Sequence, residues 1–448
     1  MESLLMNLKI LCSTLLTVSC VAAIAFSTDT DKFFNHDTTV PQKFAADKIY
    51  PQGRLFPFSF YSTGGGAIAK RGELLPGAER EADQKQIIEG GVTMIGPQYE
   101  LNEMSLETAK KYGVKMIYTI VPTIDGEKVD RAWLHKLNKE RKALDVEKVR
   151  AAIAEEVKKV AHRTEIAWWD ITPEELRFWV ANEITYLKTA YEAIKANDPL
   201  NRPAYMYEPG HRTAPGLAKL LPWQDLSAKG MYLNYSSKKE NRVWARYSVE
   251  QEVKAIEMAD RPQVVPLALP EMFQQPKPEE LKLVRDWVRH DVYCALVNGA
   301  RGVVVFSASK RPKFEARQDY LNAYLEVSRE LNGAMQLGQV FLFGKPMKDL
   351  DCTIIEGPQE IPLKLRTEEV KYSPISFANF AWNNQRYVFL VNSANVPVRA
   401  IVSELVYGSG ITVKNLFHKD HEFTAPEGDF EVKLKPLEVA AFKIYLNQ

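Results

Sequence analysis

The sequence is poor in cysteine and histidine, and it carries almost no net charge. Its 448 residues include four Cys and seven His, and 58 Lys and Arg balance 57 Asp and Glu to a net charge of +1. A nucleic-acid partner is not expected, because such proteins present a basic surface to phosphate. No Cys/His spacing fits a zinc site, so no metal is expected. No Gly-rich phosphate-binding motif follows a predicted strand, so no nucleotide cofactor is expected either.

The first 25 residues have the pattern of a secretory signal peptide. Lys9 precedes an apolar run that ends in Ala23-Ile24-Ala25, which is the small-x-small pattern of a cleavage site. We therefore expect an exported protein, in the periplasm, at the cell surface or outside the cell, with a lead segment over 26–50. Lipidation at Cys20 is a less favoured alternative. No later stretch approaches about 18 apolar residues, so no transmembrane segment is expected in the mature chain.

Residues 51–337 alternate short apolar runs with amphipathic stretches. The predicted strands are 55–61, 92–96, 114–121, 165–170, 204–208, 230–234, 264–269 and 302–306. The predicted helices include 82–89, 106–112, 146–162, 173–195, 249–258 and 278–298. Near-continuous apolar strands are typical of parallel sheets that are buried on both faces. Eight such units in series predict the α/β class and a (β/α)8 TIM barrel.

The pattern changes after residue 337. Short alternating strands separated by turn signals are predicted at 375–382, 385–392, 399–405, 411–415, 430–434 and 439–446. We expect residues 338–448 to form a smaller all-β sandwich domain. Cys294 and Cys352 could form one disulfide, but the apolar helical pattern around Cys294 favours a buried free thiol.

Carboxylates follow two of the predicted barrel strands, where active sites of such barrels lie. Glu271 ends the seventh apolar run, and Asp170, Glu174 and Glu175 follow or end the fourth. Two carboxylates across a barrel mouth can cleave a glycosidic bond, since one protonates the leaving oxygen while the other attacks the sugar or activates water. The alternatives are a buried ion pair for Glu271 and, for the other two Glu, acids in the first turn of a helix.

This arrangement resembles the (β/α)8 retaining glycoside hydrolases, which carry an acid/base Glu after strand four and a nucleophile Glu after strand seven. A β-sandwich often follows their barrel. Segments 168–175 and 194–203 look like bacterial β-galactosidase-like barrels, where a Trp-containing strand ends in Asp-Glu-Pro and a later Asp-Pro-x-x-Pro leads into strand five. Here Thr172-Pro173-Glu174-Glu175 replaces the usual pair. The resemblance therefore implies Glu271 as nucleophile and an acid among Asp170, Glu174 and Glu175.

Polar and aromatic residues near the other strand ends are candidate sugar ligands, because sugar rings pack on aromatic faces and their hydroxyls bind polar groups. The candidates are Tyr61, Trp169, Asp170, Glu208, His211, Asn234, Tyr235 and Lys310. Further aromatic residues near strand ends are Trp168, Trp223, Tyr232, Trp244 and Phe273. For Glu208, an ion pair with Arg212 or Lys310 is the structural alternative.

The sequence thus predicts an exported glycoside hydrolase with a carbohydrate substrate, no cofactor and a two-carboxylate, retaining mechanism. Two alternatives stay open: a carbohydrate-binding barrel that lacks catalysis, and a metal-dependent barrel hydrolase. The balanced charge fits an uncharged glycan, and an acidic glycan that contacts Lys310, Arg311 and Arg212 is also possible. The oligomeric state stays open.

Overall fold

The computed structural model describes residues 55–63, 77–98, 102–238, 240–403, 411–418, 422–425 and 428–445. The predicted signal peptide, lead segment and lipidation site lie outside these ranges. Within them, every helix is too short or too polar to cross a bilayer.

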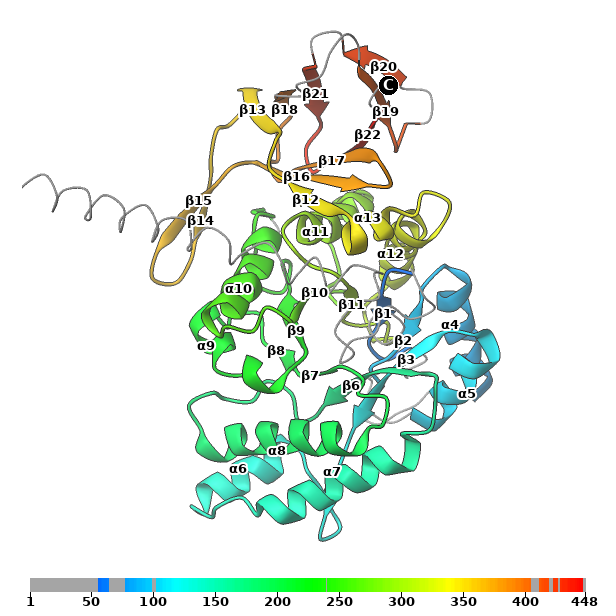
Figure 1. Cartoon of the computed structure of the whole chain (residues 1–448), viewed down its shortest axis with the longest axis vertical. Coiled ribbons are helices and arrows are strands. Elements are labelled where there is room, and N and C mark those ends of the chain that lie inside the picture. Colours follow the sequence, from blue (N-terminus) through cyan, green and yellow to red (C-terminus); the bar gives the residue numbers. More distant parts are fainter. Residues whose placement is uncertain are drawn as a thin grey trace, which may run out of the picture.

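Eight parallel strand segments form the centre of the larger part (Figure 1). They are β1 (Phe58–Phe60), β2 (Met94–Ile95), β3 (Lys115–Ile120), β6 (Ile166–Ile171), β7 with β8 (Ala204–Tyr205 and Tyr207–Glu208), β9 (Leu226–Met231), β10 (Val265–Pro270) and β11 (Val303–Val305). One sheet has the order β1-β11-β10-β9-β8 and the other the order β2-β3-β6-β7. The chain joins them at Met206, between β7 and β8. Backbone bonds from Thr93 N–H to Phe58 O (3.3 Å) and from Ser62 N–H to Pro97 O (2.9 Å) connect the segments around β1 and β2.

Helices follow most of these strands and cover their outer faces (Figure 1). They are α4 (Gly77–Glu89), α5 (Asn102–Tyr112), α6 (Arg131–Lys139), α7 (Val146–Val160), α8 (Ala181–Asn197), α9 (Ala214–Ala218), α10 (Trp244–Met258), α11 (Val284–Val297), α12 (Arg317–Asn332) and α13 (Leu337–Phe343), with 3-10 turns η2 (Leu221–Trp223) and η3 (Pro278–Leu283). A small hairpin, β4 (Thr123–Ile124) and β5 (Glu127–Lys128), follows β3. Asp130 and Asp145 cap α6 and α7 by accepting bonds from backbone N–H groups of the first turn.

Two sequence predictions need correction here. The helix predicted from Pro173 begins at Ala181, and residues 172–180 form an irregular loop. The Pro and Glu residues that resemble a helix start therefore belong to the loop that follows β6. The sixth strand runs over Leu226–Met231, ahead of the predicted 230–234, because Ser227 and Lys229 interrupt its apolar pattern.

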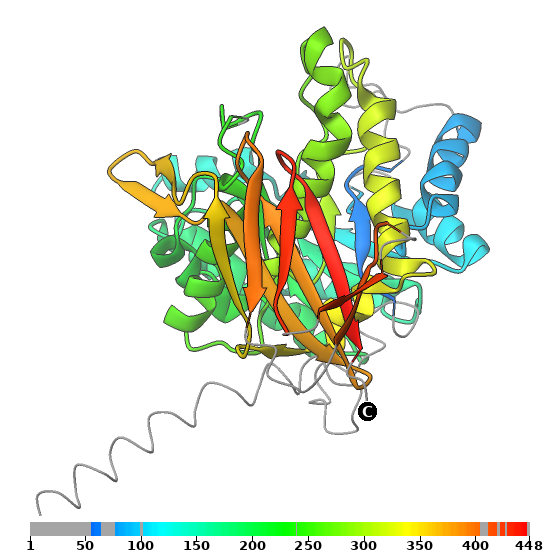
Figure 2. The same cartoon turned by 90° about the horizontal axis from the view of Figure 1, so that it is seen from above.

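The smaller part consists of antiparallel strands. They are β12 (Lys345–Met347), β13 (Asp351–Glu356), β14 (Ile361–Lys364), β15 (Glu369–Tyr372), β16 (Ile375–Trp382), β17 (Gln385–Asn392), β18 (Val398–Ser403), β19 (Ile411–Asn415), β20 (Glu422–Ala425), β21 (Phe430–Leu434) and β22 (Val439–Tyr445). A sheet of order β12-β16-β17-β22-β19-β20 and a sheet β13-β18-β21 share one apolar core (Figure 2). Alternate residues of β18 and β21 are buried, as expected for strands with one face on a core. The boundary at residue 338 stays a prediction.

Opposite faces of β6 serve two different cores. Trp168 belongs to the core that includes β1, β10 and β11, and its ring lies edge-on to Tyr205 with centroids 6.4 Å apart. Trp169 belongs to the core between β3, β6 and helices α7 and α8. Its Nε1–H donates to Asp198 Oδ2 at 2.9 Å, and the guanidinium of Arg202 lies over its ring.

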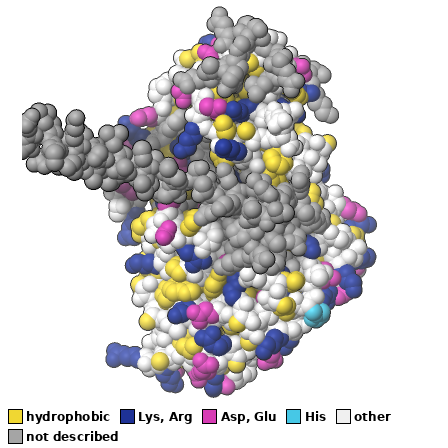
Figure 3. Space-filling model, viewed as in Figure 1, with side chains coloured by type: hydrophobic (Ala, Val, Ile, Leu, Met, Phe, Trp, Pro, Cys, Tyr) yellow, Lys and Arg dark blue, Asp and Glu magenta, His cyan; other side chains and the backbone are white. Residues whose placement is uncertain are grey.

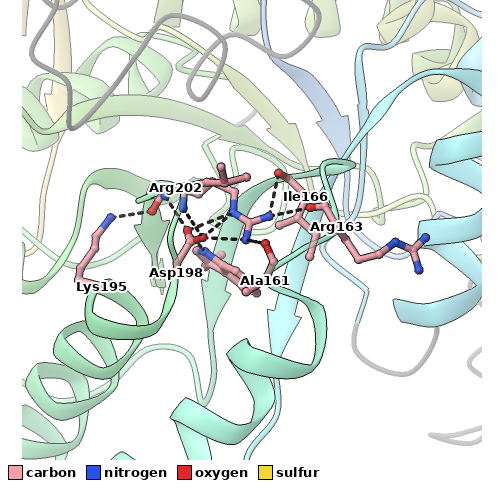
Figure 4. A network of polar contacts seen from close by, with 8 residues as sticks. Ala161, Arg163, Ile166, Lys195, Asp198 and Arg202 are labelled. Atoms are coloured by element: carbon pink, nitrogen blue, oxygen red, sulfur yellow. Dashed lines mark hydrogen bonds and ion pairs between the residues drawn. The ribbon is translucent and has the colours of Figure 1, made fainter.

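Arg202 is the centre of a buried polar network behind β6 (Figure 4). It pairs with Asp198 and donates to the backbone oxygens of Ala161 and Arg163 at 2.9 and 2.8 Å. Lys195 donates to the backbone oxygen of Arg202 at 2.6 Å. The segment that resembles Asp-Pro-x-x-Pro therefore ties α8 to β6 and to the end of α7, and it is a structural element.

Candidate active site

Glu271 lies directly after β10 and is 5% exposed. Its carboxylate accepts bonds from the backbone N–H groups of Asn234 and Tyr235, the latter at 3.0 Å. Residues 232–238 form turns after β9, and within them Lys238 N–H donates to Leu233 O at 2.7 Å. The N–H groups of Asn234 and Tyr235, at the start of this segment, donate to Glu271. Burial raises the pKa of Glu271 to about 7, although the two N–H donors lower it.

The three candidate acids of strand four have different surroundings. Asp170 is buried inside β6 and accepts a bond from Thr119 Oγ1 at 3.0 Å. Burial, together with the charge of Glu174, raises its pKa to about 8, although the bond from Thr119 lowers it. Glu175 forms an ion pair with Arg131. Glu174 is partly exposed on the loop after β6.

The loop that carries Glu174 is held by its neighbours. The backbone N–H of Glu175 donates to Tyr207 O at 3.0 Å, and Glu175 has a left-handed φ of 55°. Arg131 Nε donates to the backbone oxygen of Glu174 at 3.2 Å. A residue other than glycine in this conformation needs such support from its surroundings. The loop therefore places Glu174 at a defined position and directs Glu175 to Arg131.

Tyr232 lies directly after β9, and its phenol is buried. Burial raises its pKa well above the ordinary value, Tyr207 adds to this increase, and the charges of Glu174 and Glu271 make smaller contributions. The structure brings Glu174 and Glu271 to the same end of the parallel strands.

An aromatic cluster lies around Tyr232. Tyr207 stacks on Tyr232 and on Phe306, with centroids 6.2 and 6.3 Å apart. Tyr235 is 66% exposed, and its ring lies against that of Phe273, with centroids 5.7 Å apart. Tyr235 thus presents an aromatic face to solvent, while its backbone holds Glu271.

Several predicted sugar ligands are placed elsewhere and need correction. Tyr61 and Trp169 are fully buried in the cores. Glu208 is buried in an ion pair with Arg212, and Gln224 donates to it at 3.1 Å, which is the structural alternative named above. His211 is exposed in the turn after β8. Tyr61, Trp169 and Glu208 therefore contribute to packing, and His211 lies at the surface.

Asn234, Tyr235 and Lys310 do lie on the loops after β9 and β11. Asn234 is partly exposed and donates to Tyr320 Oη at 3.0 Å, and Lys310 is also partly exposed. The sequence interpretation did not single out Phe306 as a site residue. Its only signal is its position as the last apolar residue of the eighth predicted strand.

The surface carries mixed charge, with acidic and basic side chains intermingled over the face shown in Figure 3. In the described part of the chain, no three His, Cys, Asp or Glu side chains gather as a metal site would require. Cys294 and Cys352 are free thiols, so the structure contains no disulfide between them.

Comparison with known proteins identifies the fold. No family model and no curated protein matches the chain. Among solved structures, an alpha-amylase from Geobacillus thermoleovorans matches with 10% identity and a TM-score of 0.53 over 88% of this chain and 99% of that chain. An Anoxybacillus alpha-amylase matches with 8% identity and a TM-score of 0.54 over 88% and 98%. A glycoside hydrolase family 5 protein from Bacteroides vulgatus matches with 11% identity and a TM-score of 0.53 over 89% and 92%. The chain therefore has the fold of amylase-like and related glycoside hydrolases.

Proposed function

We propose that this chain is an exported glycoside hydrolase whose eight parallel strands close into a (β/α)8 barrel, and that it cleaves a glycan through Glu271 and Glu174. The main support is the position of these two carboxylates at the C-terminal ends of parallel strands, with Glu271 directly after β10 and Glu174 on the loop after β6. Active sites of barrels of this kind lie at that end. The fold shared with known glycoside hydrolases agrees with this function.

In this mechanism Glu271 attacks the anomeric carbon and Glu174 protonates the leaving oxygen. The backbone N–H groups of Asn234 and Tyr235 orient the Glu271 carboxylate and favour its ionised form. In the second step the deprotonated Glu174, which is partly exposed, takes a proton from a water molecule, and this water attacks the anomeric carbon and releases the sugar from Glu271. The exposed ring of Tyr235 offers a face on which a sugar can pack.

The test is hydrolysis of polysaccharides and aryl glycosides by Glu271→Gln and Glu174→Gln. We expect kcat to fall by at least about 10⁴-fold for the nucleophile variant. For the acid variant, a fall of about 10²–10⁴-fold is expected. The matched controls are Glu279→Gln, on an exposed turn, and Glu175→Gln, next to the acid. Both should keep kcat within about tenfold, since neither carboxylate is assigned a chemical step.

The stereochemistry of the first product tests the retaining mechanism, and NMR can observe it before the anomers equilibrate. A retained configuration supports a covalent intermediate on Glu271, and an inverted product would assign Glu271 to the activation of water. Full activity of Glu271→Gln would exclude both roles. Tight glycan binding without turnover in the wild type would favour the carbohydrate-binding alternative.

A further inference from the structure

Arg311 is held by contacts with the two chain segments that follow β10 and β11. Its Nη1 donates to the backbone oxygen of Met272, the residue after Glu271, at 3.3 Å. Its Nη2 donates to Ser307 Oγ at 2.6 Å. The guanidinium lies over Phe273 and Phe306, with its central carbon 5.4 and 5.8 Å from the ring centroids. The position of this cation is therefore set relative to the nucleophile and the aromatic cluster.

Five arginines that are buried or nearly so in the described part of the chain pair with a carboxylate: Arg202 with Asp198, Arg212 with Glu208, Arg242 with Asp291, Arg289 with Glu330, and Arg317 with Asp83. No ion pair connects Arg311 to an acidic residue within the described ranges. Its neighbour Lys310, also partly exposed, has no ion pair there either.

The burial of Arg311 is costly without an anion. Loss of water lowers the pKa of its guanidinium. A guanidinium has five N–H donors, and the contacts of Nη1 and Nη2 with Met272 and Ser307 leave Nε–H and one N–H of Nη2 for another acceptor. A planar anion with two oxygens suits the remaining donor geometry of an arginine.

We propose that Arg311, assisted by Lys310, binds the carboxylate of an acidic sugar, so that the substrate contains a uronic acid next to the cleaved bond. This inference rests on the proposed function, because it places the acidic sugar in the site of Glu271 and Glu174. Tyr235 and Phe273 would contact the sugar ring while Arg311 contacts its carboxylate. The preference for an acidic substrate then comes from one loop after β11.

The experiment compares aryl glucuronides and galacturonides with the matching aryl glucosides and galactosides, in both anomers, on the full chain. We expect the wild type to favour uronides, and Arg311→Gln to lower the ratio of uronide to hexoside kcat/KM at least about tenfold. Lys313→Gln, an exposed cation on the same loop, is the control and should leave the ratio within about twofold. Thermal melting verifies that the variants fold.

Calorimetric titration with glucuronate, galacturonate, glucose and glucose 6-sulfate separates this inference from the proposed function. Uronate binding that Arg311→Gln abolishes supports the inference even if the wild type cleaves no glycoside, an outcome that would refute only the hydrolase. Cleavage of hexosides with an unchanged ratio in Arg311→Gln would overturn the inference and leave the hydrolase. Binding of the sulfate ester in preference to uronates would also overturn it. Absence of both binding and cleavage would contradict both proposals.

Discussion

At the scale of single residues, the site depends on how its carboxylates are solvated. Glu271 loses most of its contact with water and receives two backbone N–H groups in exchange. Burial favours the protonated form and the N–H groups favour the ionised form, and the resulting pKa of about 7 lies between these limits. Glu271 therefore changes its charge near neutral pH, where an unperturbed glutamate is already ionised.

This shift predicts a pH-dependent stability effect of Glu271→Gln. The folded pKa of Glu271 is raised, so its protonation stabilises the native state at low pH, and that contribution is lost as the pH rises through about 7. Relative to the wild type, the variant should therefore gain about 2 kcal/mol in free energy of unfolding between pH 5 and pH 8. Urea unfolding at both pH values measures the difference. If the variant and the wild type differ in free energy of unfolding by the same amount at pH 5 and at pH 8, the pKa of Glu271 is not raised in the folded state.

The sequence identifies the strand ends but not the direction of each side chain. Glu271 could be predicted because one carboxylate follows a long apolar run. Glu174 and Glu175 are neighbours with the same chemistry, and a left-handed residue and the ion pair with Arg131 separate their roles. Both features depend on residues far away in the sequence, so no local pattern could distinguish the two acids.

At the scale of elements, the alternation of side chains along β6 explains why Trp169, a candidate sugar ligand in the sequence, is buried. Successive residues of a strand point to opposite faces, so Trp168 and Trp169 belong to different cores. The register of β6 against β3 shifts between Met116 and Ile117, which marks a bulge in the pairing. The apolar run itself is visible in the sequence, while the bulge is not. The same limit applies to β9, where Lys229 is buried against α10 residue Trp244.

The network behind β6 predicts a stability effect without a catalytic one. Asp198→Asn leaves the buried Arg202 without a charge partner, and we expect the free energy of unfolding to fall by about 3–5 kcal/mol. Activity per folded molecule should stay within about twofold, because the network lies on the helix side of the strand. Asp260→Asn, at an exposed position, is the control and should change stability by less than about 0.5 kcal/mol. Chemical denaturation combined with active-site titration would reveal a catalytic effect that contradicts this assignment.

At the scale of the whole molecule, the two parts share an apolar interface. The ring centroid of Phe341 on α13 lies 4.5 Å from that of Phe389 and 5.6 Å from that of Phe380. Both partners are on strands of the large antiparallel sheet. The change of pattern near residue 338 predicts the second fold, and the strands at 375–382 and 385–392 have the predicted bounds. The interface itself could not be predicted, since the same aromatic residues fit the inside of the sandwich equally well.

His290 adds a polar link across this interface. It is fully buried on α11, with Nδ1 2.9 Å from Asp291 Oδ1 and Nε2 2.8 Å from Ser393 Oγ, just after β17. The Ser-His-Asp arrangement is like that of a hydrolytic triad, but the Ser393 hydroxyl is buried between the two parts, where a substrate has no access. We therefore assign it to the connection between α11 and β17.

The burial of His290 predicts that acid weakens the molecule through this link. Burial lowers the pKa of His290, an effect that Asp291 opposes and Arg242 assists. Because the folded pKa is lower than the unfolded value of about 6.5, the unfolded chain binds the proton more readily, and stability is lost as the pH falls below about 6.5. Between pH 7 and pH 5, the wild type should lose up to about 2 kcal/mol more free energy of unfolding than His290→Gln. His135→Gln, on an exposed helix position, should follow the wild type. Parallel curves for the wild type and His290→Gln would show that protonation of His290 does not weaken the connection.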